Sequence, residues 1–426
     1  AYAGGEIKSE KLNINVMVYN ENDLKGQPLQ QSLTTENIEA LTLAGDDADL
    51  MQSSSIIPTE YNDNRILYKK MIENNIEFYK FSNNPNDELY SIKFSYVGES
   101  EGDYSLASTN TISNIYEYIQ PISGVKQGNY QPVINLIAPE KIQVAIVNGD
   151  YEISKNSKIK FELANSNKDK NQFSSIDDND NNGLAAKIEL ENFFTSTNKL
   201  EIVNRLQFKH INKDFRSIEN FYNTEFLRDW NLDSTLLNVN NQFNKTQNQS
   251  SAEILITKKN IGLVSYSYQN LEFVNNFKGT KHNALFNYDN NKIKVNSNNS
   301  FLKSKSELIK SEFSRSYNTI RLKNKSKWFD INLDYENNIK KNKNTDSLIV
   351  NSHRFKSYGF TAGIGDSTNI FVELGVKHMV NDSVVSNRIQ KVNASNNFSI
   401  NSRLINNSNT KLSVFANYRI LKRTNE

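Results

Sequence analysis

The sequence changes character at Ser174–Phe194, SSIDDNDNNGLAAKIELENFF, where an acidic, asparagine-rich turn leads into strict two-residue alternation. After Gly183, apolar side chains occupy every second position, and charged side chains lie between them. The apolar residues are Leu184, Ala186, Ile188 and Leu190, and the charged ones are Lys187, Glu189 and Glu191. Because the side chains of a β-strand point alternately to opposite faces, this pattern predicts a strand with one apolar and one wet side.

The same alternation recurs from Ser157 to the end of the chain. Further apolar sets are Leu200, Ile202, Leu206 and Phe208, then Ile370, Val372, Leu374 and Val376, and finally Leu412, Val414, Ala416, Tyr418 and Ile420. Short polar turns such as 289–291 and 406–409 separate them. We expect about 12 to 16 antiparallel strands, many near the roughly 9 to 11 residues that cross a bilayer when tilted.

Prolines divide the chain into two regions. All six lie at or before Pro139: Pro28, Pro58, Pro85, Pro121, Pro132 and Pro139. Proline cannot donate a hydrogen bond to a β-ladder, so a long proline-free tract favours continuous strand pairing. We therefore predict a β-rich accessory region, periplasmic or plug-like, at residues 1–150, and an antiparallel up-and-down β-barrel segment at residues 151–426.

Local signals in the first region predict short elements. Thr34 or Thr35 is expected to cap a short helix that Gly45 ends. Asn74-Asn75 predicts a hairpin turn, because asparagine tolerates the left-handed conformation. Three similar tripeptides, Gly102-Asp103-Tyr104, Gly128-Asn129-Tyr130 and Gly149-Asp150-Tyr151, are interpreted as turns that start strands. Sugar binding by their tyrosines is the alternative.

Composition narrows the class of protein. Only 37% of residues are hydrophobic, yet there are 20 tyrosines and 23 phenylalanines, which suits strands that are apolar on one face only. The net charge of +2 gives no reason to expect a nucleic-acid partner. The chain has no cysteine, which removes disulfides and thiolate metal sites. No apolar run approaches the roughly 18 residues of a spanning helix.

One motif points to a metal. Asp178, Asp180, Asn182, Gly183 and Glu189 match the spacing D-x-[DN]-x-[DN]-G-x5-E, in which oxygen side chains surround Ca²⁺. The flanking sequence is strand-like instead of helical, and Glu189 lies within an alternating strand. Two interpretations therefore stay open: a calcium site at Asp178, Asp180, Asn182 and Glu189, and a solvated asparagine-rich turn without metal.

Sequence signals for catalysis are weak. The four histidines, His210, His282, His353 and His378, lie far apart in or beside expected strands, and no pair has metal-ligand spacing. There is no G-x-S-x-G and no H-E-x-x-H motif. Asp177 and Asp178 are adjacent carboxylates, but no surrounding pattern indicates a pocket. We therefore expect a protein without catalytic activity.

Three segments between Tyr90 and Asn182 carry a family resemblance: KFSYVGESEGDY, IYEYIQPISGVKQGNYQPVINLIAPEK and ELANSNKDKNQFSSIDDNDNNGLAAK. They resemble the central part of large, uncharacterised outer-membrane β-barrel proteins of the Bacteroidota, in which β-rich modules precede a barrel. The domain order is loosely similar to that of the translocon barrel of type 9 secretion. The resemblance implies that the chain is an incomplete segment of a longer protein, and it supplies no catalytic residues.

These observations predict an outer-membrane β-barrel protein with a transport, secretion-associated or surface-structural role. Its expected partners are the lipid bilayer and other envelope proteins or secreted cargo. The first alternative is a soluble or surface-attached β-protein that binds glycan or protein through an aromatic-rich sheet. The second is a carbohydrate-active enzyme, for which two facing carboxylates in a pocket are the minimum requirement.

Overall fold

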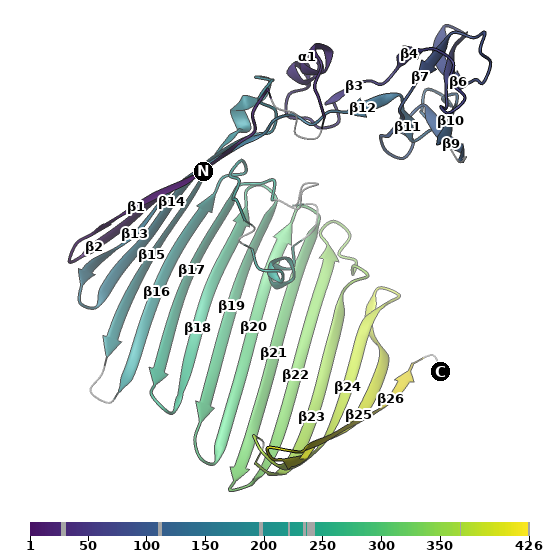
Figure 1. Ribbon diagram of the computed structural model, residues 1–426. Coiled ribbons are helices and arrows are strands. Elements are labelled where there is room, and N and C mark those ends of the chain that lie inside the picture. Colours follow the sequence, from purple (N-terminus) through teal and green to yellow (C-terminus); the bar gives the residue numbers. More distant parts are fainter. Residues whose placement is uncertain are drawn as a thin grey trace. The chain divides into compact units, whose positions relative to one another are not determined.

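The computed structural model describes residues 1–26, 31–109, 113–195, 199–219, 222–232, 236, 243–366 and 368–424. One 16-stranded sheet dominates it, and from β13 to β26 each strand pairs with its neighbours in the sequence (Figure 1). The expected all-β, antiparallel up-and-down class is therefore confirmed. In the described part of the chain β1 and β26 form the two edges and do not pair with each other, so the sheet is not closed.

The large sheet contains the alternating segments found in the sequence. Its strands are β1 (Tyr2–Lys8), β2 (Leu12–Asn22), β13 (Lys141–Ser154), β14 (Ser157–Asp169), β15 (Asn182–Thr195), β16 (Leu200–Ile211), β17 (Gln247–Lys258), β18 (Gly262–Phe273), β19 (Phe277–Asp289), β20 (Ile293–Ser306), β21 (Ile309–Asn324), β22 (Lys327–Asn342), β23 (His353–Gly365), β24 (Phe371–Val385), β25 (Arg388–Asn406) and β26 (Lys411–Arg423). Connections at one strand end are short, such as 155–156 and 325–326. Those at the other end include 23–140, 170–181 and 212–246.

The chain divides into two compact units. The smaller comprises Ala1, Tyr19–Gln143 and Asn167–Asn182, and the larger comprises Tyr2–Val18, Val144–Ser166 and Gly183–Glu426. The sequence analysis places one boundary near residue 150, whereas in the structure β1 and β2 already belong to the large sheet. The proline-rich segment is thus an insertion between β2 and β13. Local alternation could not reveal this, because it does not say which distant strand β2 pairs with.

The small unit holds one helix and short strands. They are α1 (Thr35–Ala44), β3 (Gln52–Ser54), β4 (Ile57–Thr59), β5 (Tyr68–Glu73), β6 (Ile76–Phe81), β7 (Leu89–Ser91), β8 (Ser95–Tyr96), β9 (Tyr104–Thr109), β10 (Asn114–Tyr118), β11 (Tyr130–Gln131), β12 (Val133–Asn135) and the 3-10 turn η1 (Asp178–Asp180). The helix begins and ends as predicted: the Thr34 hydroxyl accepts from the backbone N–H of Asn37, and Gly45 follows with φ 62°. Asn74 and Asn75 both have positive φ between β5 and β6, as a tight hairpin requires.

Two of the three glycine-tyrosine tripeptides pair with each other. Gly102 and Gly128 form an antiparallel bridge, and Tyr104 lies opposite Tyr130. A Cβ on Gly102 would stand 2.3 Å from the backbone N of Tyr130, so only glycine allows this approach. Tyr104 is buried, and its hydroxyl accepts a hydrogen bond of 2.9 Å from the backbone N–H of Tyr79. These tripeptides thus hold the fold of the small unit together.

Candidate functional site

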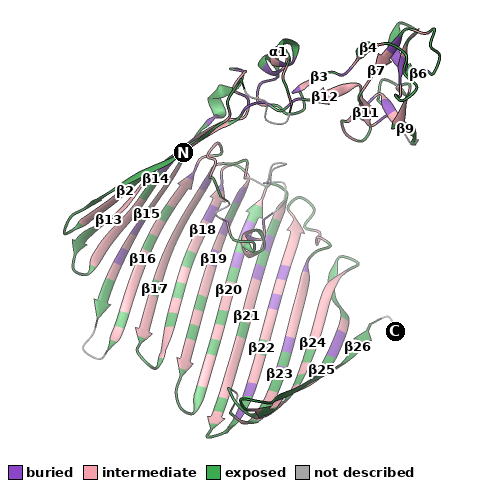
Figure 2. Cartoon of the chain, in the orientation of Figure 1, coloured by how far each residue is buried: buried purple, intermediate pink, exposed green. Residues whose placement is uncertain are grey.

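The large sheet separates apolar from polar side chains onto two faces. On the face that we call the outer face, residues in direct register form apolar rows across β22–β26. One row consists of Phe329, Ala362, Leu374, Ile400 and Ala416, and the next of Ile331, Phe360, Val376, Phe398 and Tyr418. A hollow of about 500 Å³ lies along them, and Leu374 is 55% exposed. Half-buried and exposed residues alternate along the first half of β24, and every residue of β26 is exposed (Figure 2). Contiguous exposed apolar area of this kind marks a contact surface for lipid or protein.

Aromatic side chains with polar tips lie on the outer face of β18–β20. The Tyr266 hydroxyl and His282 Nδ1 are 2.8 Å apart, and the His282 ring also contacts the rings of Tyr268 and Phe301. Rings that combine an apolar body with a polar group favour the boundary between hydrocarbon and water. The rings of Tyr266, Tyr268 and His282 are of this kind.

A hydrogen-bonded polar quartet interrupts the outer face on β20 and β21. Asn299 lies opposite Ser316, and Ser297 lies opposite Asn318. The Ser316 hydroxyl donates to the Asn299 Oδ1 at 2.5 Å, and the Ser297 hydroxyl donates to the Asn318 Oδ1 at 2.5 Å. The two amide groups donate back along each strand, each to a serine hydroxyl at 2.8 Å. The quartet thus satisfies its own polar groups, which lowers the cost of facing an apolar environment.

The opposite, inner face carries charge networks that bridge neighbouring strands. Arg205 on β16 binds Glu191 on β15 at 2.7 Å and Glu253 on β17 at 2.6 Å. Lys160 on β14 approaches Glu191 at 2.5 Å, and the side chain of Glu191 is only 5% exposed. A buried carboxylate needs such partners to stay charged. Paired charged side chains therefore make the inner face polar.

The β16–β17 connection contacts this inner face. It contains α2 (Phe226–Trp230), whose Asp229 accepts from Arg315 at 2.7 Å, while the following Asn231 donates to Ser311 and Asn338. Apolar residues of the connection and of the strands form a buried cluster that contains Trp230, Leu232, Leu236, Leu271, Phe273, Phe277, Leu302 and Phe313. Sequence reasoning missed this contact. The feature of the sequence that points to this contact is Trp230, a large apolar residue in a segment without strand alternation.

The proposed calcium ligands do not share one site. Asp178 and Asp180 lie in η1, Asn182 begins β15, and Glu189 stands seven residues further along that extended strand, about 23 Å away. Glu189 is buried beside cations on the inner face, with Lys160 at 3.4 Å. Among the residues that the structure describes, no group of three or more acidic, histidine or cysteine side chains could hold a metal. Calcium binding at the turn stays a prediction.

The acidic loop that contains the turn instead stabilises α1. The fully buried Asn171 donates its amide to the backbone carbonyls of Leu41 at 2.7 Å and of Gly45 at 2.6 Å. The Asp177 carboxylate accepts from the backbone N–H of Asp46 at 3.2 Å. The Asn171 contacts satisfy carbonyl groups that the end of the helix leaves without partners, and the Asp177 contact holds the backbone that follows it. The segment at which the sequence changes character therefore has a structural role within the small unit.

The histidines make local hydrogen bonds. His210 and His378 each lie 2.7 Å from an asparagine on the neighbouring strand, Asn248 and Asn396 respectively. The Nε2 of His353 lies 3.0 Å from Glu336. Together with the contact between His282 and Tyr266, these bonds account for all four histidines as side chains of the sheet.

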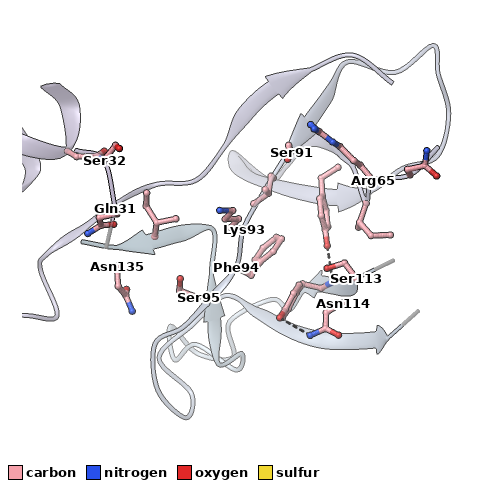
Figure 3. Close-up of a pocket in the computed structure, with 17 residues that line it drawn as sticks. Gln31, Ser32, Arg65, Ser91, Lys93, Phe94, Ser95, Ser113, Asn114 and Asn135 are labelled. Carbon is pink, nitrogen blue, oxygen red and sulfur yellow. Dashed lines mark hydrogen bonds between the residues drawn. The ribbon is translucent and has the colours of Figure 1, made fainter. Parts of the chain in front are cut away.

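A polar pocket of about 870 Å³ lies in the small unit (Figure 3). Tyr68, Phe94 and Tyr116 supply aromatic surface, and Arg65 and Lys93 supply positive charge. No carboxylate lines the pocket, and in the described ranges neither Arg65 nor Lys93 takes part in an ion pair. The pocket therefore suits a polar or anionic ligand better than a cation.

Comparison with known protein families and with curated proteins finds no match for this sequence. None of the helices in the described part of the chain is long and apolar enough to cross a membrane.

Proposed function

We propose that the chain forms part of an outer-membrane β-barrel protein with a non-catalytic role in transport, in secretion or in the structure of the cell surface. The observation that carries this proposal is the apolar outer face, with rows such as Phe329, Ala362, Leu374, Ile400 and Ala416 in register across five strands. Transmembrane barrels have the same alternation of lipid-facing and lumen-facing residues, with an outward apolar band flanked by aromatics.

The mechanism that we propose is passive. In hydrocarbon every backbone group must be paired within the protein, and sheet ladders do this for all interior strands. The charged inner face then borders a water-filled space, in which the β16–β17 connection occupies part of the surface. Lipid is the main partner, and other envelope proteins or secreted cargo would meet the inner face or the small unit. Neither catalysis nor nucleic-acid binding forms part of this proposal.

Fractionation of the native full-length protein tests the proposal. We expect recovery in the outer membrane and a faster mobility on a gel when the sample is not boiled, because a closed barrel resists detergent until heated. Recovery in the wash fraction, with the same mobility before and after boiling, would contradict a membrane barrel.

A second proposed function rests on the pocket of the small unit. A surface-attached protein that binds acidic glycans would use Arg65 and Lys93 for the charge and the half-buried Tyr116 for stacking on a sugar ring. Titration with an acidic oligosaccharide tests this, with Arg65→Gln expected to weaken binding and Lys80→Gln, outside the pocket, as control. Equal binding by both variants would contradict it. A carbohydrate-active enzyme is the weakest alternative, because the pocket lining offers no pair of carboxylates.

A further inference from the structure

Four lysines stand side by side on the outer face, at the strand ends that carry the long connections. Lys278 on β19 lies directly opposite Lys305 on β20, Lys305 opposite Lys310 on β21, and Lys310 opposite Lys341 on β22. We call these four residues the lysine row. Neighbouring strands are about 4.8 Å apart, so the row extends for about 14 Å. Like charges directly opposite one another destabilise a sheet, so the row has a cost in folding that needs a compensating partner.

The protein itself compensates only part of this charge. Asp346, in the β22–β23 connection, contacts Lys310 at 2.5 Å and Lys341 at 3.1 Å. Glu272 on β18 lies directly opposite Lys278, but within the described ranges neither Lys278 nor Lys305 forms an ion pair. Lys303 lies two residues before Lys305 on the same face of β20. It pairs with Glu312 at 3.2 Å, but its side chain is 71% exposed. The row also lines a hollow of about 550 Å³ together with Thr280, Lys303 and Glu312 of the same face.

The position of the row identifies its partner. The lysines share the outer face with the aromatic group around His282, and Phe301 precedes Lys305 by four residues on the same strand, about 13 Å away. Lysine side chains can lie along an apolar surface while their ammonium groups reach the polar layer above it. We propose that the lysine row binds the phosphate of an anionic lipid headgroup. This inference rests on the proposed membrane function, because it places the row at the level of the headgroups.

The chemistry favours a lipid over an acidic protein or a free phosphate. An ammonium group is a compact point charge that binds phosphate without demanding a fixed orientation, and it gains affinity near an anionic membrane surface. The acyl chains of a lipid would meet the exposed apolar residues further along the same strands, such as Phe286 and Leu333. A free phosphate has no apolar part that could contact those residues.

Titration of the detergent-solubilised full-length protein tests the proposal, with bound molecules counted by native mass spectrometry. The probes are phosphatidylglycerol, phosphatidylcholine, pyrophosphate and polyglutamate. The row variant carries Lys278→Gln, Lys305→Gln, Lys310→Gln and Lys341→Gln. A control variant carries the same substitution at four exposed lysines near the short-turn ends: Lys258, Lys259, Lys325 and Lys327.

We expect wild type and the control variant to prefer phosphatidylglycerol over phosphatidylcholine, and the row variant to bind phosphatidylglycerol at least about tenfold more weakly. Equal affinity of the two variants would overturn the proposal. So would pyrophosphate or polyglutamate binding to wild type as tightly as phosphatidylglycerol. Heat-dependent gel mobility of the row variant distinguishes the headgroup site from the proposed barrel. If the row variant keeps this mobility shift and still binds phosphatidylglycerol as wild type does, the headgroup site is wrong and the barrel proposal stands.

Discussion

An arginine on the outer face should destabilise the protein in a bilayer, and the same arginine on the inner face should not. Leu374 is the position best suited to this test, because it is 55% exposed and its row lies beside the apolar row of Phe360 and Val376. A charged residue on the lipid face of a barrel costs about 2 to 4 kcal/mol at the bilayer midplane and about 0 to 1 kcal/mol near the interfaces. Leu374 lies three residues from the start of β24, between these two levels, so we expect a cost of about 1 to 2 kcal/mol. In water, a leucine on a merely exposed sheet surface could be replaced at a cost within about 0.5 kcal/mol. The two environments therefore predict clearly different free energies of unfolding for Leu374→Arg.

The matched control is Asn401→Arg on the neighbouring strand. Asn401 is exposed on the inner face and lies directly opposite Glu373, so the new charge stays in a polar setting. The measurement is denaturant-induced unfolding of both variants after folding into phosphatidylcholine vesicles. We expect Leu374→Arg to lower the free energy of unfolding by about 1 to 2 kcal/mol and Asn401→Arg to leave it nearly unchanged. A difference below about 0.5 kcal/mol between the two would refute a lipid-facing outer surface.

Three further predictions concern the small unit. Asn171→Ala should lower its free energy of unfolding by about 2 to 4 kcal/mol in denaturant titrations, because two buried carbonyls lose their donor. Burial raises the pKa of Tyr79 and of Tyr104 to about 12. Phenolate absorbance should therefore show a group of late-titrating tyrosines, and Tyr104→Phe should remove one member of this group. Since the folded state favours the neutral phenols, their stabilisation is complete below about pH 10 and is lost towards pH 12. Finally, Asp178→Ala with Asp180→Ala should leave the melting temperature in excess calcium unchanged, and a calcium-dependent rise confined to wild type would instead establish a metal site.

Local signals in the sequence predict most of the strands and the small helix. The alternation at Leu184–Glu191 is that of β15, and the capping residues Thr34 and Gly45 bound α1. Each of these features depends on residues close together in the chain, where backbone geometry leaves few choices. The same holds for the hairpin at Asn74 and Asn75, whose left-handed backbone needs residues that tolerate it.

Features that depend on distant pairing were not predictable in this way. The strand β2 resembles any other alternating strand, and nothing near it indicates that its partner β13 begins at Lys141. The calcium motif shows the same limit: Glu189 has the right spacing in sequence, but an extended strand carries it away from the turn. A loop or a helix at the same positions would have brought the carboxylates back together. Motif spacing has meaning only for the local structure in which it was defined.

The two edges of the large sheet give the strongest constraint on its surroundings. Every residue of β1 and of β26 is exposed, and β26 presents apolar side chains on its outer face up to the edge. Soluble sheets usually protect such an edge with proline, a bulge or charges. In hydrocarbon each unpaired backbone group costs several kcal/mol, so an open edge is not tolerated there. If the outer face meets lipid, β26 must therefore pair with β1 or with another strand, and the continuous apolar surface at this edge suits it to such pairing.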